Sequence, residues 1–320
     1  MKLLYRIGFS IVCFMLLYLP ASHARHIVDM MGRTVEVPVK IERVASPYRI
    51  ATEMIITLGA QDKLVGVSTV PGDIIKHYFP DITNLSLADR HSSVEEFLRM
   101  KPDVIFTTYS PVVDKLAQSG ISVFCMKVEN PDSMLEGMLM IGDVLNKTEQ
   151  AQNFARYFKA KLDHIEAMTK AITPKKAVYV VGPKILITVG GDFYQNFIVQ
   201  YAGGINVARD LRGGWVPVSR EHLIAWDPDV FITIGYTAMD PSQIKNDAGL
   251  APLKALKTNA IYIFPSYIDS WDMPTPESLL AIMWLANILY PEKVNFDMHK
   301  EAREFYLKFY GSYPQEVRLN

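Results

Sequence analysis

The chain has 320 residues, of which 49% are hydrophobic and 21% charged, and its formal net charge at pH 7 is −1. This length is typical of two ordinary domains. Because acidic and basic residues nearly balance, the composition gives no basic footprint, and we expect no nucleic-acid partner and no binding to an anionic membrane.

The N-terminus has the layout of a secretory signal peptide. Basic residues precede an apolar run over residues 7–19, and Ser22 and Ala24 stand at positions −3 and −1 of a cleavage site before Arg25. The run is shorter than the roughly 20 residues of a membrane-spanning helix. We therefore predict that residues 1–24 are removed and that the mature protein is periplasmic. An uncleaved membrane helix is the alternative.

Cysteine usage agrees with a soluble mature chain without disulfides. Cys13 lies inside the apolar run, and its neighbours Ile11 and Val12 are not the small residues of a lipoprotein processing site. Cys125 is the only cysteine left after cleavage, so no intramolecular disulfide can form.

An internal repeat divides the chain. Residues 93–107 align without gaps on residues 219–233, with six identical positions. Each copy predicts a short helix capped by Ser93 or Ser219, a Pro-Asp turn and a buried strand. We expect the apolar pairs Phe97/Leu98 and Leu223/Ile224 to form the inner faces of the two helices.

Further signals around both copies extend this pattern. Short apolar runs at residues 43–45, 64–67 and 177–181 predict strands, and Gly59 and Gly203 are placed to end helices. The predicted fold class is α/β, with a mainly parallel central sheet flanked by helices in each of two lobes.

One long helix is predicted between the halves. Apolar residues recur at helical spacing from Thr148 to Ile172, and Pro174 ends the pattern. At 1.5 Å per residue this helix would be about 37 Å long, enough to join two lobes. The predicted domains are therefore a signal peptide (1–24), an N-terminal lobe (25–147), an interlobe helix (148–173) and a C-terminal lobe (174–320).

Several segments in this order match one family. They are residues 29–38, residues 58–67, both copies of the repeat and residues 271–276. Together they resemble the periplasmic substrate-binding proteins of iron-siderophore, haem and cobalamin ABC importers, the class with a single long interlobe helix. The resemblance covers essentially the whole mature chain.

This resemblance implies a function. The protein would capture a metal complex, with iron-siderophore or haem favoured, and deliver it to an inner-membrane ABC permease with its cytoplasmic ATPase. Cobalamin, a nickel chelate and a molybdate or tungstate oxyanion are alternative cargoes. The resemblance also implies a monomer without an intrinsic cofactor, whose bound ligand is a metal chelate.

In that family a glutamate at the tip of each lobe pairs with arginines of the permease. Glu95 and Glu221 occupy the matching positions, each two residues after a capping serine. The alternative is that they only complement the helix dipole. A reciprocal capping box would instead use Glu96, which the second copy replaces with His222.

Ligands of open α/β sheets bind beyond the carboxyl ends of the strands, so the candidates lie in loops that follow predicted strands. The aromatic residues offer flat faces and hydroxyls to a large chelate, and Arg49 and Lys184 could bind carboxylates or an oxyanion. Each tyrosine could alternatively pack with its hydroxyl in water. The candidate ligand-binding residues are Tyr48, Arg49, Tyr109, Ser110, Lys184, Tyr194, Tyr236, Tyr267 and Trp271, with Thr108, Asp192, Phe193 and Asp272 beside them.

The rival class is a doubly wound α/β enzyme. The glycine pairs of the second half form neither G-x-G-x-x-G nor a phosphate loop, and G-x-S-x-G and H-E-x-x-H motifs are absent from the sequence. No His-x3-His or Cys-x2-Cys pair suggests direct metal ligation, and His91 is the one histidine that could face the cleft. We predict a binding protein with no catalytic residues and no metal site of its own.

Overall fold

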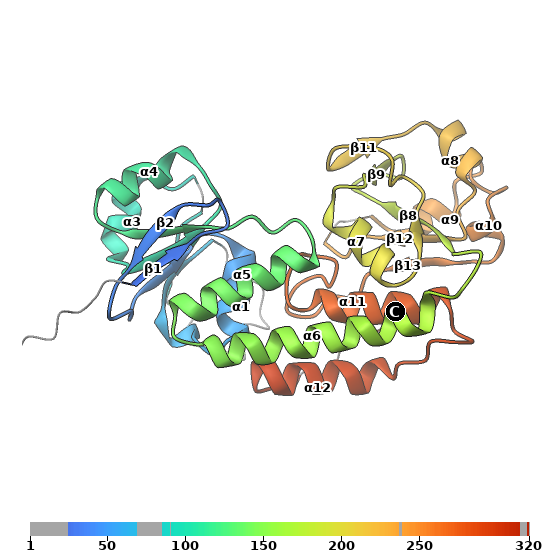
Figure 1. Ribbon diagram of the computed structural model, residues 1–320. Coiled ribbons are helices and arrows are strands. Elements are labelled where there is room, and N and C mark those ends of the chain that lie inside the picture. The colour runs from blue at the N-terminus through green and yellow to red at the C-terminus, as the bar shows by residue number, and fades with distance from the viewer. Residues whose placement is uncertain (1–24, 69–84, 90, 237–238, 314–318, 320) are drawn as a thin grey trace, which may run out of the picture.

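The computed structural model describes residues 25–68, 85–89, 91–236, 239–313 and 319, which form two α/β lobes above a layer of long helices (Figure 1). The predicted signal peptide lies outside these residues. Within the described ranges no helix combines the length and apolarity that crossing a membrane requires.

The N-terminal lobe is built on a five-stranded parallel sheet with strand order β5-β4-β3-β6-β7. All four residues of β6 are buried, as expected for an apolar strand covered on both faces. The strands are β3 (Val44–Ser46), β4 (Leu64–Val67), β5 (Ser86–Leu87), β6 (Val104–Thr107) and β7 (Ser122–Cys125), and a separate antiparallel pair is β1 (Arg25–Val28) and β2 (Thr34–Val37). The helices are α1 (Arg49–Thr57), the 3-10 turn η1 (Gln61–Lys63), α3 (Val94–Met100), α4 (Pro111–Gln118) and α5 (Pro131–Val144).

The C-terminal lobe has a mixed sheet with order β11-β9-β8-β12-β13, and β10 also pairs with β8. The strands β8, β10, β12 and β13 are parallel, as predicted, whereas β9 pairs antiparallel with both β8 and β11. The loop from β8 to β9 is too short for a crossover and can only form a hairpin. The strands are β8 (Ala177–Val181), β9 (Ile187–Val189), β10 (Ile205–Asn206), β11 (Trp215–Pro217), β12 (Val230–Thr233) and β13 (Ile261–Ile263). The helices of this lobe's upper part are α7 (Tyr194–Tyr201), α8 (Arg220–Trp226), α9 (Pro241–Lys245) and α10 (Lys254–Lys257).

The two copies of the sequence repeat adopt the same helix, turn and strand. The Ser93 hydroxyl accepts the Glu96 amide at the start of α3, and the Ser219 hydroxyl accepts the His222 amide at the start of α8. Only the first copy completes the reciprocal capping box, because His222 has no carboxylate to return to the cap.

The Pro-Asp turns anchor each copy to the first strand of its sheet. The amide of Asp103 donates to the carbonyl of Arg43 at 2.8 Å, and the amide of Asp229 donates to the carbonyl of Ala177 at 2.8 Å. As a result β6 lies beside β3 in one lobe, and β12 lies beside β8 in the other.

The prediction for the inner faces of α3 and α8 holds for one residue of each apolar pair. Phe97 and Leu223 are buried, but Leu98 is 43% and Ile224 41% exposed. Each helix has only seven residues and touches its sheet along one row, so a residue adjacent to the buried one turns away from the core.

A long helix joins the lobes, as predicted, and observed α6 runs from Thr148 to Thr169. It buries an apolar row along its length and lies beside α11 (Ser278–Leu289) and α12 (Met298–Tyr310) (Figure 1). Phe154 of α6 packs edge-on against Phe309, with 5.0 Å between ring centroids. The hydroxyl of Thr57 in α1 donates to Tyr310 at 3.2 Å, so α12 returns from the C-terminal part of the chain to the N-terminal lobe.

A buried ionic cluster joins α1 to the segment that precedes α11. Arg49 Nη2 lies 2.5 Å from Asp269 Oδ1, and Arg49 Nε lies 3.5 Å from Glu53 Oε1. Glu277 accepts the amide of Asp269 at 2.9 Å and the hydroxyl of Tyr306. One cation therefore lies among three buried carboxyl groups.

The protonated forms of these glutamates are favoured in the folded state. Burial, and then the nearby Asp269 and Glu277 carboxylates, raise the pKa of Glu53 well above its ordinary value, against the opposing charge of Arg49. Burial likewise raises the pKa of Glu277 from 4.5 to about 8. At a pH between the ordinary glutamate pKa of 4.5 and about 8, the folded protein binds more protons than the unfolded chain does.

We predict that the stability of the protein falls as pH rises through this window, because the unfolded chain releases protons that the folded cluster retains. Glu53→Gln, which mimics the neutral acid, should reduce the fall in Tm between about pH 5 and about pH 8.5. Thermal unfolding followed by circular dichroism measures this. Glu136→Gln, at an exposed position of α5, is the matched control and should keep the wild-type profile. An unchanged profile in Glu53→Gln would contradict the assignment.

Candidate ligand-binding site

A cavity of about 360 Å³ lies between the two lobes. One wall comes from the N-terminal lobe, where Val128 and Glu129 follow β7, and the other from the C-terminal lobe, where Tyr236 follows β12. Loops after the carboxyl ends of parallel strands therefore face each other across the cavity, as expected for ligand sites of open α/β sheets. The remaining lining residues are Asp192, Phe193, Tyr194, Gln195, Met273 and Pro274.

Asp272 organises the C-terminal wall from behind. Its carboxylate accepts the side-chain amide of Gln195 at 3.0 Å, the backbone amide of Gly235 at 3.2 Å and the hydroxyl of Ser270. Complete burial raises the pKa of Asp272, and the three hydrogen-bond donors oppose this rise. The carboxylate thereby ties together the start of α7, the loop after β12 and the segment before α11.

The cavity surface is aromatic and apolar with an acidic rim. Phe193 and Tyr236 present ring atoms, and Tyr236 is 45% exposed. The acidic residues are Glu129, which pairs with Lys127 at 3.1 Å, and Asp192, whose carboxylate accepts the amide of Gly213. Among the described residues that line the cavity there is no lysine or arginine. Such a surface suits a ligand that is neutral or cationic and that can stack on aromatic rings.

Four residues that the sequence singled out line this cavity, namely the candidates Tyr194 and Tyr236 together with Asp192 and Phe193. Tyr236 is accessible, whereas Tyr194 is only 5% exposed and shares a hydrogen bond of 2.9 Å with the hydroxyl of Ser278. Tyr194 therefore presents an edge to the cavity while its hydroxyl is already satisfied.

Four other candidates do not line this cavity but lie among the contacts that join α1, α12 and the segment before α11, here called the floor. Arg49 is not the free guanidinium that we expected, because its Nη2 pairs with Asp269 at 2.5 Å and its Nε lies 3.5 Å from Glu53. Tyr48 is half-buried at the start of α1, and Tyr267 packs edge-on against Tyr306. Trp271 is fully buried and donates its indole N–H to Tyr306 at 3.0 Å, so it supports the floor instead of offering an exposed face.

The remaining candidates lie elsewhere. Tyr109 and Ser110 line a separate cavity of about 480 Å³ in the N-terminal lobe, together with His91. The Tyr109 hydroxyl donates to Asp114 at 3.3 Å. Lys184 is exposed in the hairpin between β8 and β9 and lines neither cavity.

Sequence reasoning missed Val128, Glu129 and Gln195, along with Met273 and Pro274. Val128 and Glu129 follow a buried strand, which is the signal that selected the other candidates, but neither has the aromatic or basic chemistry that we sought. Gln195 reaches the cavity from the first turn of α7 and Met273 from the segment before α11, and no sequence pattern indicates that either side chain lines a cavity.

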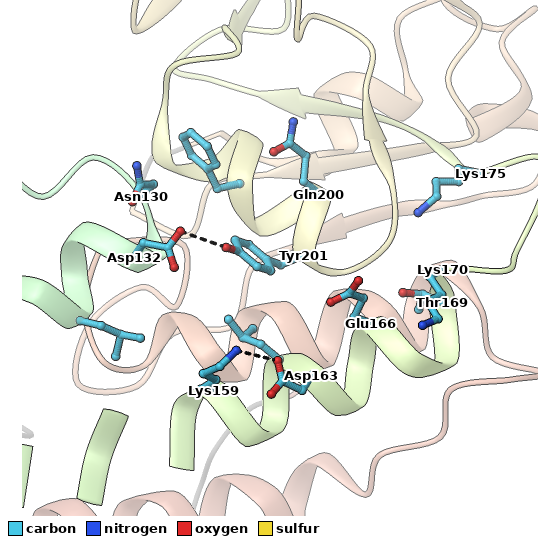
Figure 2. Close-up of a pocket in the computed structure, with 13 residues that line it drawn as sticks. Asn130, Asp132, Lys159, Asp163, Glu166, Thr169, Lys170, Lys175, Gln200 and Tyr201 are labelled. Carbon is cyan, nitrogen blue, oxygen red and sulfur yellow. Dashed lines mark hydrogen bonds and ion pairs between the residues drawn. The ribbon is translucent and has the colours of Figure 1, made fainter. Parts of the chain in front are cut away.

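A larger cavity, of about 650 Å³, lies over the connecting helix (Figure 2). Its walls come from α5, α6 and α7, and the Tyr201 hydroxyl donates to Asp132 at 3.4 Å across one side. An exposed ion pair of 3.0 Å joins Lys159 to Asp163 on the α6 side. Side chains of helices, with balanced charges, form most of this larger cavity. The candidate ligand site is therefore the smaller cavity, which lies beside the loops that follow the parallel strands.

The two predicted docking glutamates lie at corresponding places on different lobes. Glu95 is exposed in the first turn of α3, and Glu221 is exposed in the first turn of α8 (Figure 1). Hydrogen bonds from the backbone amide of Glu221 and from the Ser219 hydroxyl lower the pKa of the Glu221 carboxyl, so this side chain is charged at neutral pH. Across the described residues, no group of three or more histidine, cysteine or acidic side chains is placed to hold a metal ion.

Comparison with known proteins gives the same architecture. The molybdate-binding protein MolA of Haemophilus influenzae is 28% identical over 319 residues, covering 89% of this chain and 91% of MolA. The vitamin B12-binding protein of Vibrio parahaemolyticus is 24% identical, covering 76% of this chain and 87% of that protein. Both relatives are named as binding proteins.

Solved structures extend the likeness to three dimensions and confirm the predicted two-lobed α/β fold. A periplasmic solute binding protein of Veillonella parvula superposes with a TM-score of 0.82 at 26% identity, covering 91% of this chain and 94% of that one. MolA bound to molybdate superposes with a TM-score of 0.80 at 26% identity, covering 91% and 99%.

The family model described as periplasmic binding protein matches residues 44–268, which include both copies of the repeat and most of the cavity. As this match spans more than half of the sequence, the chain belongs to the periplasmic binding protein family.

Proposed function

We propose that this protein is the solute-binding subunit of an ABC importer, that it captures a metal-containing small molecule between its lobes and that it has no catalytic activity. The observation that carries the proposal is the interlobe cavity, whose opposing walls come from strand-end loops of two sheets. The proposed partners are an inner-membrane permease and its cytoplasmic ATPase. The proposed location is the periplasm, reached by cleavage after Ala24.

A compact metal chelate is the first cargo candidate. A cavity of about 360 Å³ can enclose a compact ligand, whereas a ligand as large as cobalamin would stay largely outside it. Aromatic and apolar side chains with acidic residues at the rim favour a neutral or cationic complex over a free dianion. A ferric siderophore of modest size fits this chemistry, in line with the cargo favoured by the sequence resemblance.

An oxyanion is the second candidate. The similarity to MolA, a molybdate-binding protein, supports it over most of the chain. Arg49 does not line the cavity and is already paired with Asp269, so it does not supply the positive charge in this structure. An oxyanion would therefore depend on backbone and side-chain hydrogen-bond donors of the cavity.

We further propose the domain boundaries 25–147, 148–173 and 174–320, with Glu95 and Glu221 as the residues that dock on the permease. Two charged side chains in matching first turns, one on each lobe, suit a partner with two basic sites. The isolated protein is proposed to be a monomer.

Thermal-shift measurements should identify the cargo. A ligand at 100 times its Kd stabilises the folded state by about 2.7 kcal/mol. We expect a rise in Tm with a ferric siderophore or haemin, or else with molybdate or tungstate, in a panel that also holds cobalamin and nickel with histidine. Absence of any shift across the panel would reject the metal-complex cargo.

Tyr236→Ala should weaken cargo binding about tenfold, because it removes an accessible aromatic face from the cavity wall. Calorimetric titration with the ligand that raises Tm measures this. Tyr109→Ala is the matched control, since Tyr109 is similarly exposed but lines the other cavity. A larger effect at Tyr109 would move the binding site into the N-terminal lobe.

Glu95→Ala combined with Glu221→Ala should abolish cargo uptake by cells and leave cargo affinity unchanged, because both side chains are exposed and far from the cavity lining. Uptake of radiolabelled metal in a strain that lacks the wild-type protein provides the readout. Reduced cargo affinity in the double variant would show that these glutamates do not act in docking.

A further inference from the structure

One side chain in the wall of the interlobe cavity has a buried polar atom without a partner. Gln195, the second residue of α7, lines the cavity, although only 2% of its surface is exposed. Its Nε2 donates to Asp272 Oδ2 at 3.0 Å, whereas its Oε1 is buried and accepts no hydrogen bond from the part of the chain that the structure describes. A buried carbonyl oxygen without a donor is unfavourable, so a ligand that supplies one gains affinity here.

Asp272 decides which end of the Gln195 amide is left over. The two ends of an amide have the same shape, and only the hydrogen-bond network distinguishes them. The Asp272 carboxylate is completely buried and also accepts the backbone amide of Gly235 and the hydroxyl of Ser270. Because an ionised carboxylate can only accept, it holds the Nε2 end of the Gln195 amide and leaves the Oε1 end without a partner. Gln195 therefore offers an acceptor and not a donor.

The charged residues around the cavity favour the same kind of ligand. Glu129 and Asp192 contribute carboxylates, and the described lining residues contribute no lysine or arginine to balance them. An oxyanion such as molybdate has only acceptors, so it would meet the Gln195 oxygen and two like charges. A cation whose charge lies on an N–H group would meet complementary groups at the wall and at the rim.

The Gln195 oxygen is covered in this structure, and Tyr236 is the neighbour with room to move. Burial and then the Asp272 carboxylate raise the pKa of Tyr236, and the adjacent Gln195 amide opposes this rise. The Tyr236 side chain is nevertheless 45% exposed, so its ring can turn toward solvent without disturbing the core. Such a turn opens the Gln195 oxygen to a ligand.

Resting on the proposed function, we propose that Gln195 selects cargo that carries an N–H or O–H donor, and that Asp272 is the positioning residue behind this preference. The favoured class is a neutral or cationic chelate with an ammonium, amide or hydroxyl group directed at the C-terminal wall. Oxyanions that have only acceptors are selected against. Gln195 is thus a specificity-determining residue, and its preference depends on one hydrogen bond behind the wall.

Two probes test this preference in calorimetric titrations of the mature chain. One is a linear ferric trihydroxamate with a terminal primary ammonium group, and the other is the same chelate with a trimethylammonium group, which keeps the charge but has no N–H. The wild-type protein should bind the ammonium form about tenfold tighter. Gln195→Met keeps the length of the side chain without its carbonyl and should bring the ratio close to one. Gln200→Met, at an exposed position of the same helix, is the matched control and should keep the wild-type ratio.

Asp272→Asn tests the positioning role separately. The oxygen of the new amide can still accept from Gly235 and Ser270, while its NH2 group donates to Gln195 Oε1 and turns Gln195 Nε2 toward the cavity. The preference for the ammonium chelate should disappear, and molybdate should bind about tenfold tighter than it binds the wild-type protein.

The outcomes separate this inference from the proposed function. Equal binding of the two chelates by the wild-type protein, or a preference that survives in both variants, overturns the role of Gln195. Molybdate that binds the wild-type protein more tightly than the ammonium chelate does also overturns it, and leaves the importer role intact. Absence of binding by both chelates and molybdate would reject the metal-complex cargo as well. The wild-type comparison needs no variant, so it decides the question even if a substitution lowers the Tm.

Discussion

The packing of α6 against α11 and α12 is the constraint on which the rest of the structure depends. These helices form a single layer under both lobes, and α12 reaches back to α1 through the hydrogen bond between Thr57 and Tyr310 (Figure 1). The ionic contact between Arg49 and Asp269 closes the same joint from above. Because two helices and the ion pair of the half-buried Arg49 cross from one lobe to the other, large hinge motions are costly.

The floor and the wall of the cavity are separate layers of the structure. Arg49 and Trp271 use their polar groups on Asp269 and Tyr306, inside the joint. Asp272 connects that joint to the wall by holding Gln195 and the loop after β12. Asp272 therefore supports the cavity wall at the start of α7 and at the loop after β12, and such support favours selective capture of a small ligand.

Much of the fold could be predicted from the sequence because its signals are local. The repeat, its serine caps and its Pro-Asp turns specify helix, turn and strand within fifteen residues each, and the apolar spacing of α6 specifies a long helix. The antiparallel β9 and β11 were missed, since strand direction depends on where a short hairpin leads and not on composition. The return of α12 to the N-terminal lobe is a tertiary contact without a local signal.

The candidate site was predicted only in part, again because it depends on tertiary contacts that have no local signal in the sequence. Position after a strand selected Tyr194 and Tyr236, which line the cavity, but it does not tell whether a side chain faces the cavity or the core. Trp271 faces the core because an indole N–H partner, Tyr306, arrives from α12. Arg49 is neutralised because Asp269 arrives from a segment more than 200 positions later. Chemistry-based selection also passed over Val128 and Glu129, whose place in the cavity depends only on the geometry of β7.

Capture of the ligand between the lobes is tested most directly by hydrogen–deuterium exchange, measured with and without the ligand that raises Tm. We expect slower exchange in peptides that contain residues 128–129, 192–195 and 273–274, from both lobes at once. Protection confined to the α3–α4 region, or to residues 159–170 around the cavity of Figure 2, would contradict it.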